Sequence, residues 1–141
     1  METTDKKKLL WIAALGSTLE LYDFSLFAVM APVFAVQFFP HLDAKLALFL
    51  SLATFACGFI VRPFTAILWG YLGDRFGRKV ALSYTLLAMA VPTLAIGLLP
   101  TYQDIGFWAP VLLMICRMLQ GASMSGEFNG AMIFILEHHP N

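Results

Sequence analysis

Residues 46–79 of this 141-residue chain read LALFLSLATFACGFIVRPFTAILWGYLGDRFGRK. The first 27 residues of this stretch form an apolar run that contains one charged residue, Arg62. A helix rises about 1.5 Å per residue, so roughly 20 apolar residues cross the hydrocarbon layer of a bilayer. The run therefore predicts a transmembrane helix, and the basic residues after it predict a cytoplasmic end.

Three further stretches share this composition. Together, the four apolar stretches lie at about residues 9–36, 46–72, 80–99 and 107–136. The connections are short, at residues 37–45, 73–79 and 100–106. The whole chain is 60% hydrophobic and 13% charged, whereas soluble domains are about 45–50% apolar and about 25% charged. The sequence thus predicts an all-α integral membrane protein, with four transmembrane helices in one membrane domain over residues 1–141.

The basic residues outside these stretches predict the orientation. They are Lys6, Lys7 and Lys8 before the first stretch, Lys45 in the first connection, and Arg75, Arg78 and Lys79 in the second. Cytoplasmic segments collect lysine and arginine, so both termini and the second connection are expected in the cytoplasm. The formal net charge is zero, and this lack of a basic surplus argues against nucleic-acid binding.

Five charged residues fall inside the predicted helices: Glu20, Asp23, Arg62, Arg117 and Glu127. Each costs about 2.5–3.5 kcal/mol at the bilayer centre on insertion scales. The first four lie about 15–21 Å deep at the helical rise, which predicts that acids and bases pair inside the bundle or a wet cavity. A carboxyl group beside an arginine can exchange a proton as its surroundings change, which suggests proton coupling. The alternative is that the charges only fix helix register, or that Glu127 reaches the membrane interface.

Helical periodicity gives the fourth stretch two faces. Arg117, Gln120 and Gly121 share one face, and Gly126 and Gly130 lie on the other. Small residues let a second helix approach closely, so the three glycines are the predicted packing positions. The third stretch carries no charged residue and is predicted to be peripheral.

Sites for metals, cofactors or enzymatic chemistry are not indicated. His41, His138 and His139 lack metal-ligand spacing, and Cys57 and Cys116 are interpreted as small apolar residues within helices. No pairing of a nucleophile with a base is apparent, so an enzyme is not predicted.

The segment Gly70–Lys79, GYLGDRFGRK, is the most specific string in the chain. Gly73 and Gly77 predict a tight turn, and Asp74 precedes the N-terminus of the next predicted helix, where an acid is favourable. The remaining charged residues of the string are Arg75, Arg78 and Lys79.

This string matches the G-x-x-x-D-R-x-G-R-K signature of major facilitator superfamily transporters. Five other strings resemble the metabolite:proton symporter family, which includes proline/betaine, citrate, shikimate and dicarboxylate transporters. They are GSTLELYDFSLF at 16–27, IVRP at 60–63, IGFWAP at 105–110, RMLQG at 117–121 and SGEFNGA at 125–131. The resemblance covers about residues 11–140.

The resemblance implies helices 1–4 of the first half of a twelve-helix transporter, so the chain is incomplete relative to that fold. The first and fourth helices are expected to line a central cavity. The predicted cavity and proton-coupling residues are Glu20, Asp23, Arg62, Arg117, Gln120, Glu127 and Asn129. The implied cytoplasmic gate comprises Gly70, Gly73, Asp74, Arg75, Gly77, Arg78 and Lys79, with Asp74 contacting a helix of the other half.

The expected function is therefore the N-terminal part of a symporter in a bacterial inner membrane, driven by the proton gradient. Its partners would be membrane lipid, protons and a small polar metabolite such as an organic acid, betaine or amino acid. Such transporters bind substrate between repeats, so four helices supply at most one wall of the site. The alternative is a truncated, transport-inactive four-helix module that acts by associating with other transporter helices or with itself. The sequence leaves the substrate, the oligomeric state and a possible split transporter open.

Overall fold

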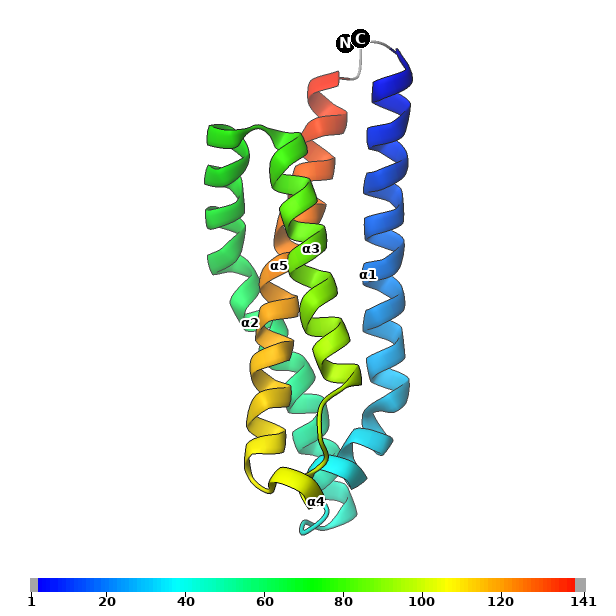
Figure 1. Ribbon diagram of the computed structural model, residues 1–141, viewed down its shortest axis with the longest axis vertical. Coiled ribbons are helices and arrows are strands. Elements are labelled where there is room, and N and C mark those ends of the chain that lie inside the picture. Colours follow the sequence, from blue (N-terminus) through cyan, green and yellow to red (C-terminus); the bar gives the residue numbers. More distant parts are fainter. Residues whose placement is uncertain (1–2, 139–141) are drawn as a thin grey trace.

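The computed structural model describes residues 3–138, with the side chains of residues 11, 14–77, 80, 81 and 83–126. This part of the chain is helical and contains no strand, so the all-α prediction is confirmed (Figure 1). The five helices are α1 (Thr3–Phe38), α2 (Ala44–Phe76), α3 (Arg78–Gly97), α4 (Tyr102–Ile105) and α5 (Trp108–His138).

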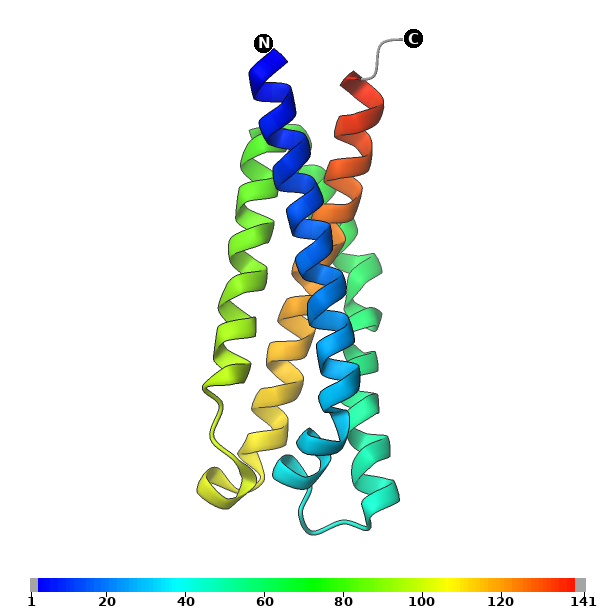
Figure 2. The ribbon, with the colours of Figure 1, turned by 90° about the vertical axis from the view of Figure 1, so that its right-hand side faces the viewer.

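The four long helices form an elongated bundle (Figures 1 and 2). Helix α5 packs most extensively against α2 and α3, and less against α1. The start of α1, the end of α5 and the turn between α2 and α3 lie at one end of the bundle, and α4 lies at the other. The predicted cytoplasmic segments therefore share one end.

The turn between α2 and α3 is shorter than predicted. Helix α2 continues to Phe76, and only Gly77 separates it from α3. Gly77 has φ 91°, a conformation that glycine adopts without steric cost, and its amide donates to the Gly73 carbonyl. Placing Gly73 in the turn was therefore wrong, and Asp74 lies in the last turn of α2. One residue with positive φ suffices to reverse the chain here.

The connection predicted over residues 100–106 contains the short helix α4. The side chain of Thr101 faces the third residue of this helix, and the Thr101 amide donates to Asp104 Oδ2 at 2.9 Å. This capping box satisfies amide groups at the helix start. The Thr-x-x-Asp spacing was present in the sequence as a signal for this turn of helix.

Glycines mark the closest contacts of α5. A Cβ atom placed on Gly121 would overlap the Gly58 carbonyl oxygen of α2, so the two backbones cross in direct contact. A Cβ atom placed on Gly126 would overlap Thr85 of α3 and crowd the Trp69 ring of α2. The third predicted packing position, Gly130, lies outside the residues whose surroundings the structure describes.

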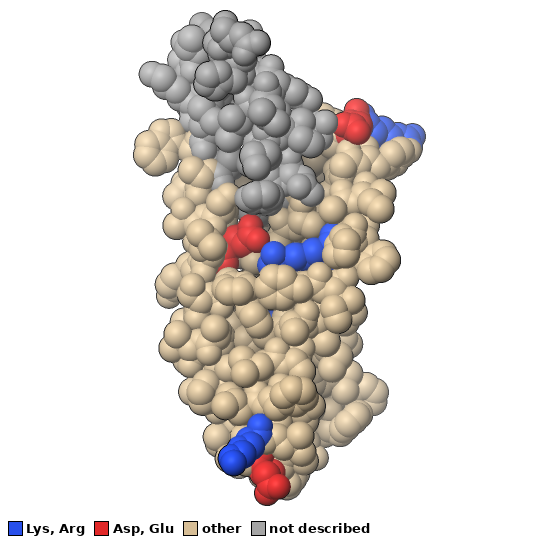
Figure 3. All heavy atoms as spheres, turned by 180° about the vertical axis from the view of Figure 1, so that it is seen from behind, with Lys and Arg blue, Asp and Glu red and all other residues tan. Residues whose placement is uncertain are grey.

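The bundle exposes much apolar surface. Two helices are long and apolar enough to cross a membrane, Ala14–Phe38 and Ala44–Phe76, and Ser83–Gly97 is apolar but shorter among the described residues. Large apolar side chains such as Val29, Phe64 and Ile67 are more than 70% exposed. Figure 3 shows charged side chains near both ends of one face and in one patch between them, and uncharged residues over the rest of the described surface on that face. This pattern suits a bilayer environment.

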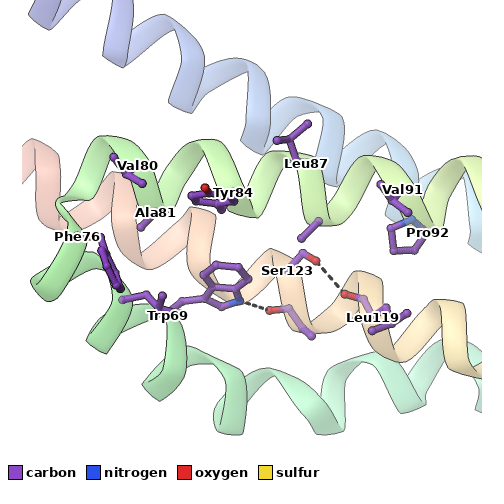
Figure 4. Close-up of a pocket in the computed structure, with 13 residues that line it drawn as sticks. Trp69, Phe76, Val80, Ala81, Tyr84, Leu87, Val91, Pro92, Leu119 and Ser123 are labelled. Carbon is purple, nitrogen blue, oxygen red and sulfur yellow. Dashed lines mark hydrogen bonds between the residues drawn. The ribbon is translucent and has the colours of Figure 1, made fainter.

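A groove of about 860 Å³ lies between α2, α3 and α5 (Figure 4). Apolar side chains such as Trp69, Phe76 and Val91 line it, and none of the described residues in its lining is charged. The Trp69 indole donates to the Ala122 carbonyl at 2.7 Å, which satisfies the one polar atom of this ring. The groove is therefore separate from the intramembrane charges.

Candidate functional site

The predicted intramembrane charges of α1, α2 and α5 meet as two ion pairs. Asp23 Oδ2 lies 3.1 Å from Arg117 Nη1, and Glu20 Oε1 lies 3.7 Å from Arg62 Nη1. Each pair joins α1 to a different helix, because Arg62 belongs to α2 and Arg117 to α5. The structure thus brings together the four deep charges whose side chains it describes.

The Asp23–Arg117 pair is the more enclosed of the two. The Arg117 side chain is 5% exposed, and its guanidinium carbon lies 3.5 Å from the centre of the Phe27 ring. Phe27 follows Asp23 by one helical turn, so α1 presents a carboxylate and an aromatic face to the same cation. A cation over a ring is attracted by the negative face of the π system, more strongly where water is excluded.

Gln120 extends this pair toward α3. Its side-chain oxygen accepts a hydrogen bond from Arg117 Nη1, and its amide nitrogen donates to Thr93 Oγ1 at 2.7 Å. Gln120 is 1% exposed and Arg117 5%, so the bond between them forms in the bundle interior, whereas Thr93 at the other end is exposed. The series of hydrogen bonds from Asp23 through Arg117 and Gln120 to Thr93 therefore connects α1, α5 and α3.

The Glu20–Arg62 pair has a looser geometry. The Arg62 and Glu20 side chains are 28% and 16% exposed, and their closest atoms are farther apart than in the other pair. Arg62 also donates to Met124 Sδ at 3.0 Å and lies over the Phe59 ring at 4.3 Å. The longer distance and the more accessible arginine make this the less tightly held of the two pairs.

Phenylalanine rings separate and support the two pairs. Phe24 meets Phe55 and Phe59 edge to face at centroid distances of 4.7 and 5.5 Å, and Phe27 stacks on Phe55 at 5.4 Å. These rings exclude water from one side of each guanidinium. A low local dielectric constant strengthens the electrostatic interactions inside such a site.

A cavity of about 320 Å³ lies between α1, α3 and α5 beside the Asp23–Arg117 pair. Its polar lining comes from Asp23, Gln37, Thr93, Arg117 and Gln120. The cavity therefore has hydrogen-bonding side chains and both partners of the ion pair in its wall. Among the described residues, no group of three or more His, Cys, Asp or Glu side chains is placed to hold a metal ion.

The predicted gate residues lie away from the ion pairs, at the end of the bundle where α2 meets α3. Asp74 and Arg75 are exposed there, and Arg75 Nη1 donates to the Tyr71 hydroxyl at 2.9 Å. Gly70 is open, because a Cβ atom placed on it would meet no described atom within 4 Å. The side chains of Arg78, Lys79, Glu127 and Asn129 lie outside the described residues.

Sequence reasoning missed Thr93 and Phe55 as parts of the site. Thr93 is on the helix predicted to be peripheral because it lacks charge, yet its hydroxyl contacts Gln120. Thr93 is the one polar residue in the apolar run AVPTLAIG, and this could have indicated that its hydroxyl has a partner inside the bundle. Phe55 gave no such signal, since an aromatic residue in an apolar helix is most often simply packed.

Comparisons with known proteins show which family the chain resembles. The family model described as "Sugar (and other) transporter" matches residues 9–141. The proline/betaine transporter of Escherichia coli (strain K12) is 41% identical over 96% of the chain and 27% of its own length. The glycine betaine/proline/ectoine/pipecolic acid transporter of Dickeya dadantii is 40% identical over 96% of the chain and 27% of its own length. A putative proline/betaine transporter of Staphylococcus aureus (strain COL) is 40% identical over 96% of the chain and 29% of its own length. The chain thus spans little more than a quarter of these relatives, and no solved structure matches it.

Proposed function

Because the chain belongs to the sugar (and other) transporter family of the major facilitator superfamily, we propose that it forms the N-terminal part of a proton-coupled symporter. Its proposed substrate class is a small zwitterionic metabolite such as proline or a betaine. Relatives at 40–41% identity carry these compounds in their names, which supports the choice. The proposed location is the inner membrane of a bacterium, with four helices crossing it and both termini in the cytoplasm.

The observation that carries this proposal is the buried Asp23–Arg117 pair. A charge at the bilayer centre is costly, so such residues are retained mainly for pathways and relays. Proton uptake on Asp23 removes the negative charge that Arg117 faces at 3.1 Å. The arginine stays protonated and loses its charged acceptor on α1, and this changes how strongly α1 is held against α5. A proton is thereby linked to a movement of helices.

The other predicted residues have supporting roles in this proposal. Glu20 and Arg62 form a second pair that can exchange partners with the first, and Glu127 and Asn129 extend the polar face of α5 by their positions in sequence. The segment Gly70–Lys79 acts as the cytoplasmic gate, with Asp74 directed toward a helix beyond the present chain.

A second candidate function is a transport-inactive module that associates with other membrane helices or with itself. The apolar groove between α2, α3 and α5 favours it, because about 860 Å³ of open apolar space suits helix packing. Transport measurements separate the two candidates.

The test joins residues 1–141 to the part of the E. coli proline/betaine transporter that follows the matched segment. This chimera is produced in cells that lack proline and betaine uptake. We expect uptake of radiolabelled proline or glycine betaine that a protonophore abolishes and that Asp23→Asn reduces to background. The matched control is Asp43→Asn, which alters an exposed carboxylate without a side-chain capping bond and should leave uptake intact. Uptake that persists in Asp23→Asn with the protonophore present would contradict proton coupling through this pair. A well-expressed chimera without uptake would favour the second candidate.

A further inference from the structure

Helix α3 contributes one hydroxyl group to the charged network. Thr93 Oγ1 accepts from Gln120 Nε2 at 2.7 Å and donates to the Met89 carbonyl of its own helix at 2.8 Å. Gln120 in turn accepts from Arg117 Nη1, which also donates to Asp23 Oδ2 at 3.1 Å. Thr93 is therefore the end of a continuous series of hydrogen bonds that starts at Asp23.

The direction of every bond in this series is fixed by chemistry. A guanidinium group can only donate, so the side-chain oxygen of Gln120 has to face Arg117. The amide nitrogen of Gln120 then faces Thr93 and needs an acceptor there. The Thr93 oxygen is that acceptor because its own hydrogen goes to Met89. Thr93 thus sets which way the Gln120 amide points.

This orientation gives Arg117 Nη1 two acceptors, one charged and one neutral. The charged one is Asp23, and the neutral one is the Gln120 oxygen. When Asp23 takes up a proton, its attraction for Arg117 weakens, whereas the hydrogen bond from Arg117 to the Gln120 oxygen is unaffected. We propose that Thr93 is a positioning residue for proton coupling, which locks the Gln120 amide so that its oxygen retains Arg117 while Asp23 is protonated. The inference rests on the proposed function.

A second ion pair and several other ionisable groups lie on the helices around this series. Glu20 of α1 and Arg62 of α2 face each other. The other titratable side chains described on these helices are Tyr22 of α1, Lys45, Cys57, Tyr71, Asp74 and Arg75 of α2, Tyr84 of α3, Tyr102 and Asp104 of α4, and Cys116 of α5. None of these described side chains lines the cavity beside the Asp23–Arg117 pair. The side chains of Arg78, Lys79 and Glu127 lie outside the described residues. Among the described hydrogen bonds, the bond from Gln120 to the Thr93 hydroxyl is the one that links α3 to this series.

Thr93→Val in the chimera removes the hydroxyl and keeps a similar side-chain shape. The Gln120 amide is then free to rotate, and Arg117 depends more strongly on ionised Asp23. We expect the external pH at half-maximal uptake to become more acidic by about half a unit to one unit, the equivalent of one hydrogen bond. Uptake at the most acidic pH should approach that of the unmodified chimera. Thr93→Ser keeps the hydroxyl and should restore the original pH profile.

Thr54→Val is the matched control. Thr54, like Thr93, donates to the carbonyl four residues earlier in a long helix, at 2.8 Å, but it is on α2 and outside this series. The two differ in burial, since Thr54 is 3% exposed and Thr93 belongs to the exposed residues. We expect no change in the pH profile. Thr93→Ala, which is less demanding sterically, is measured beside Thr93→Val. An unchanged midpoint in both Thr93 variants, or uptake lost equally at every pH, overturns the positioning role.

A thermal-unfolding cycle on the purified 141-residue chain tests the contact without transport. Thr93→Val, Gln120→Leu and the double variant are compared, and the shared bond predicts that the two single losses are not additive. Additive losses overturn the inference. If the unmodified chimera takes up no substrate, the proposed function fails, whereas normal proton-driven uptake with an unshifted Thr93→Val midpoint refutes only the role of Thr93.

Discussion

Gly121→Ala directly tests the crossing of α2 and α5. The added methyl group would overlap the Gly58 carbonyl oxygen and would lie 2.6 Å from the Gly58 carbonyl carbon and 2.8 Å from its Cα. Ordinary van der Waals contact begins near 3.4 Å. The clash is with backbone atoms, which cannot rotate away, so the two helices have to separate by about 0.8 Å or more.

This separation affects the most extensive helix contact in the bundle. Overpacking of a tight interior costs about 1–3 kcal/mol, while replacing a helical glycine by alanine returns about 0.5–1 kcal/mol through helix propensity. We therefore expect Gly121→Ala to destabilise the protein by about 1–2 kcal/mol. Thermal or detergent-induced unfolding of the purified chain, followed by its helical circular dichroism signal, measures the change.

Two glycines of the partner helix α2 serve as graded controls. A Cβ atom on Gly58 would lie 3.1 Å from the Arg117 carbonyl oxygen, a contact that a small shift relieves, and one on Gly70 would meet nothing within 4 Å. The expected order of stability is Gly70→Ala at or above the unmodified chain, then Gly58→Ala, then Gly121→Ala. If Gly121→Ala is as stable as Gly70→Ala, the two backbones do not approach as described and the argument fails.

Three further changes test other parts of the bundle. Arg117→Lys keeps the charge but loses the planar group stacked on Phe27, so proton-driven uptake by the chimera should fall well below that of the unmodified protein at equal expression. Ser51→Ala removes the 3.0 Å bond from Ser51 Oγ to the Ala31 carbonyl and should lower the free energy of unfolding by about 0.6–1.7 kcal/mol, with no change in the pH profile of uptake. After replacement of the native cysteines by alanine, a membrane-impermeant maleimide should label Gln103→Cys from outside intact cells and Phe76→Cys only after lysis. The opposite labelling pattern would contradict the proposed orientation.

The number and order of the long helices could be predicted from the sequence, because hydropathy and length are properties of each segment alone. The exact ends could not. The string GDRFGRK contains enough polar and glycine residues for a loop, yet only Gly77 leaves the helix. Helix α2 continues through Gly73 and Asp74 because, in a membrane protein, a helix pairs every backbone N–H with a carbonyl of the same segment.

The charged site was partly predictable for a similar reason. Depth estimated from the helical rise is enough to place Glu20, Asp23, Arg62 and Arg117 at one level, since each helix crosses the same layer. It does not say which acid meets which base, because this depends on the rotation of each helix about its axis. The contact of Gln120 with Thr93 depends further on where α3 packs, and a single polar residue on an apolar helix is a weak signal for it.

The helices that meet at the ion pairs are joined in different ways, and proton uptake should affect them unequally. Helices α2 and α5 are in backbone contact at Gly58 and Gly121, close to the Arg117 carbonyl, and no charge is involved in that contact. Helix α1 packs less on α5 and is held there at this level by Asp23 and the Phe27 ring. Asp23→Asn, which mimics the neutral carboxyl group, should therefore loosen α1 more than the α2–α5 contact. Hydrogen–deuterium exchange of the purified chain should show faster exchange in α1 peptides around Asp23, with peptides containing Gly58 and Gly121 unchanged. Equal acceleration in all three helices would mean that the pair stabilises the bundle as a whole, and proton uptake would then have no selective effect on α1.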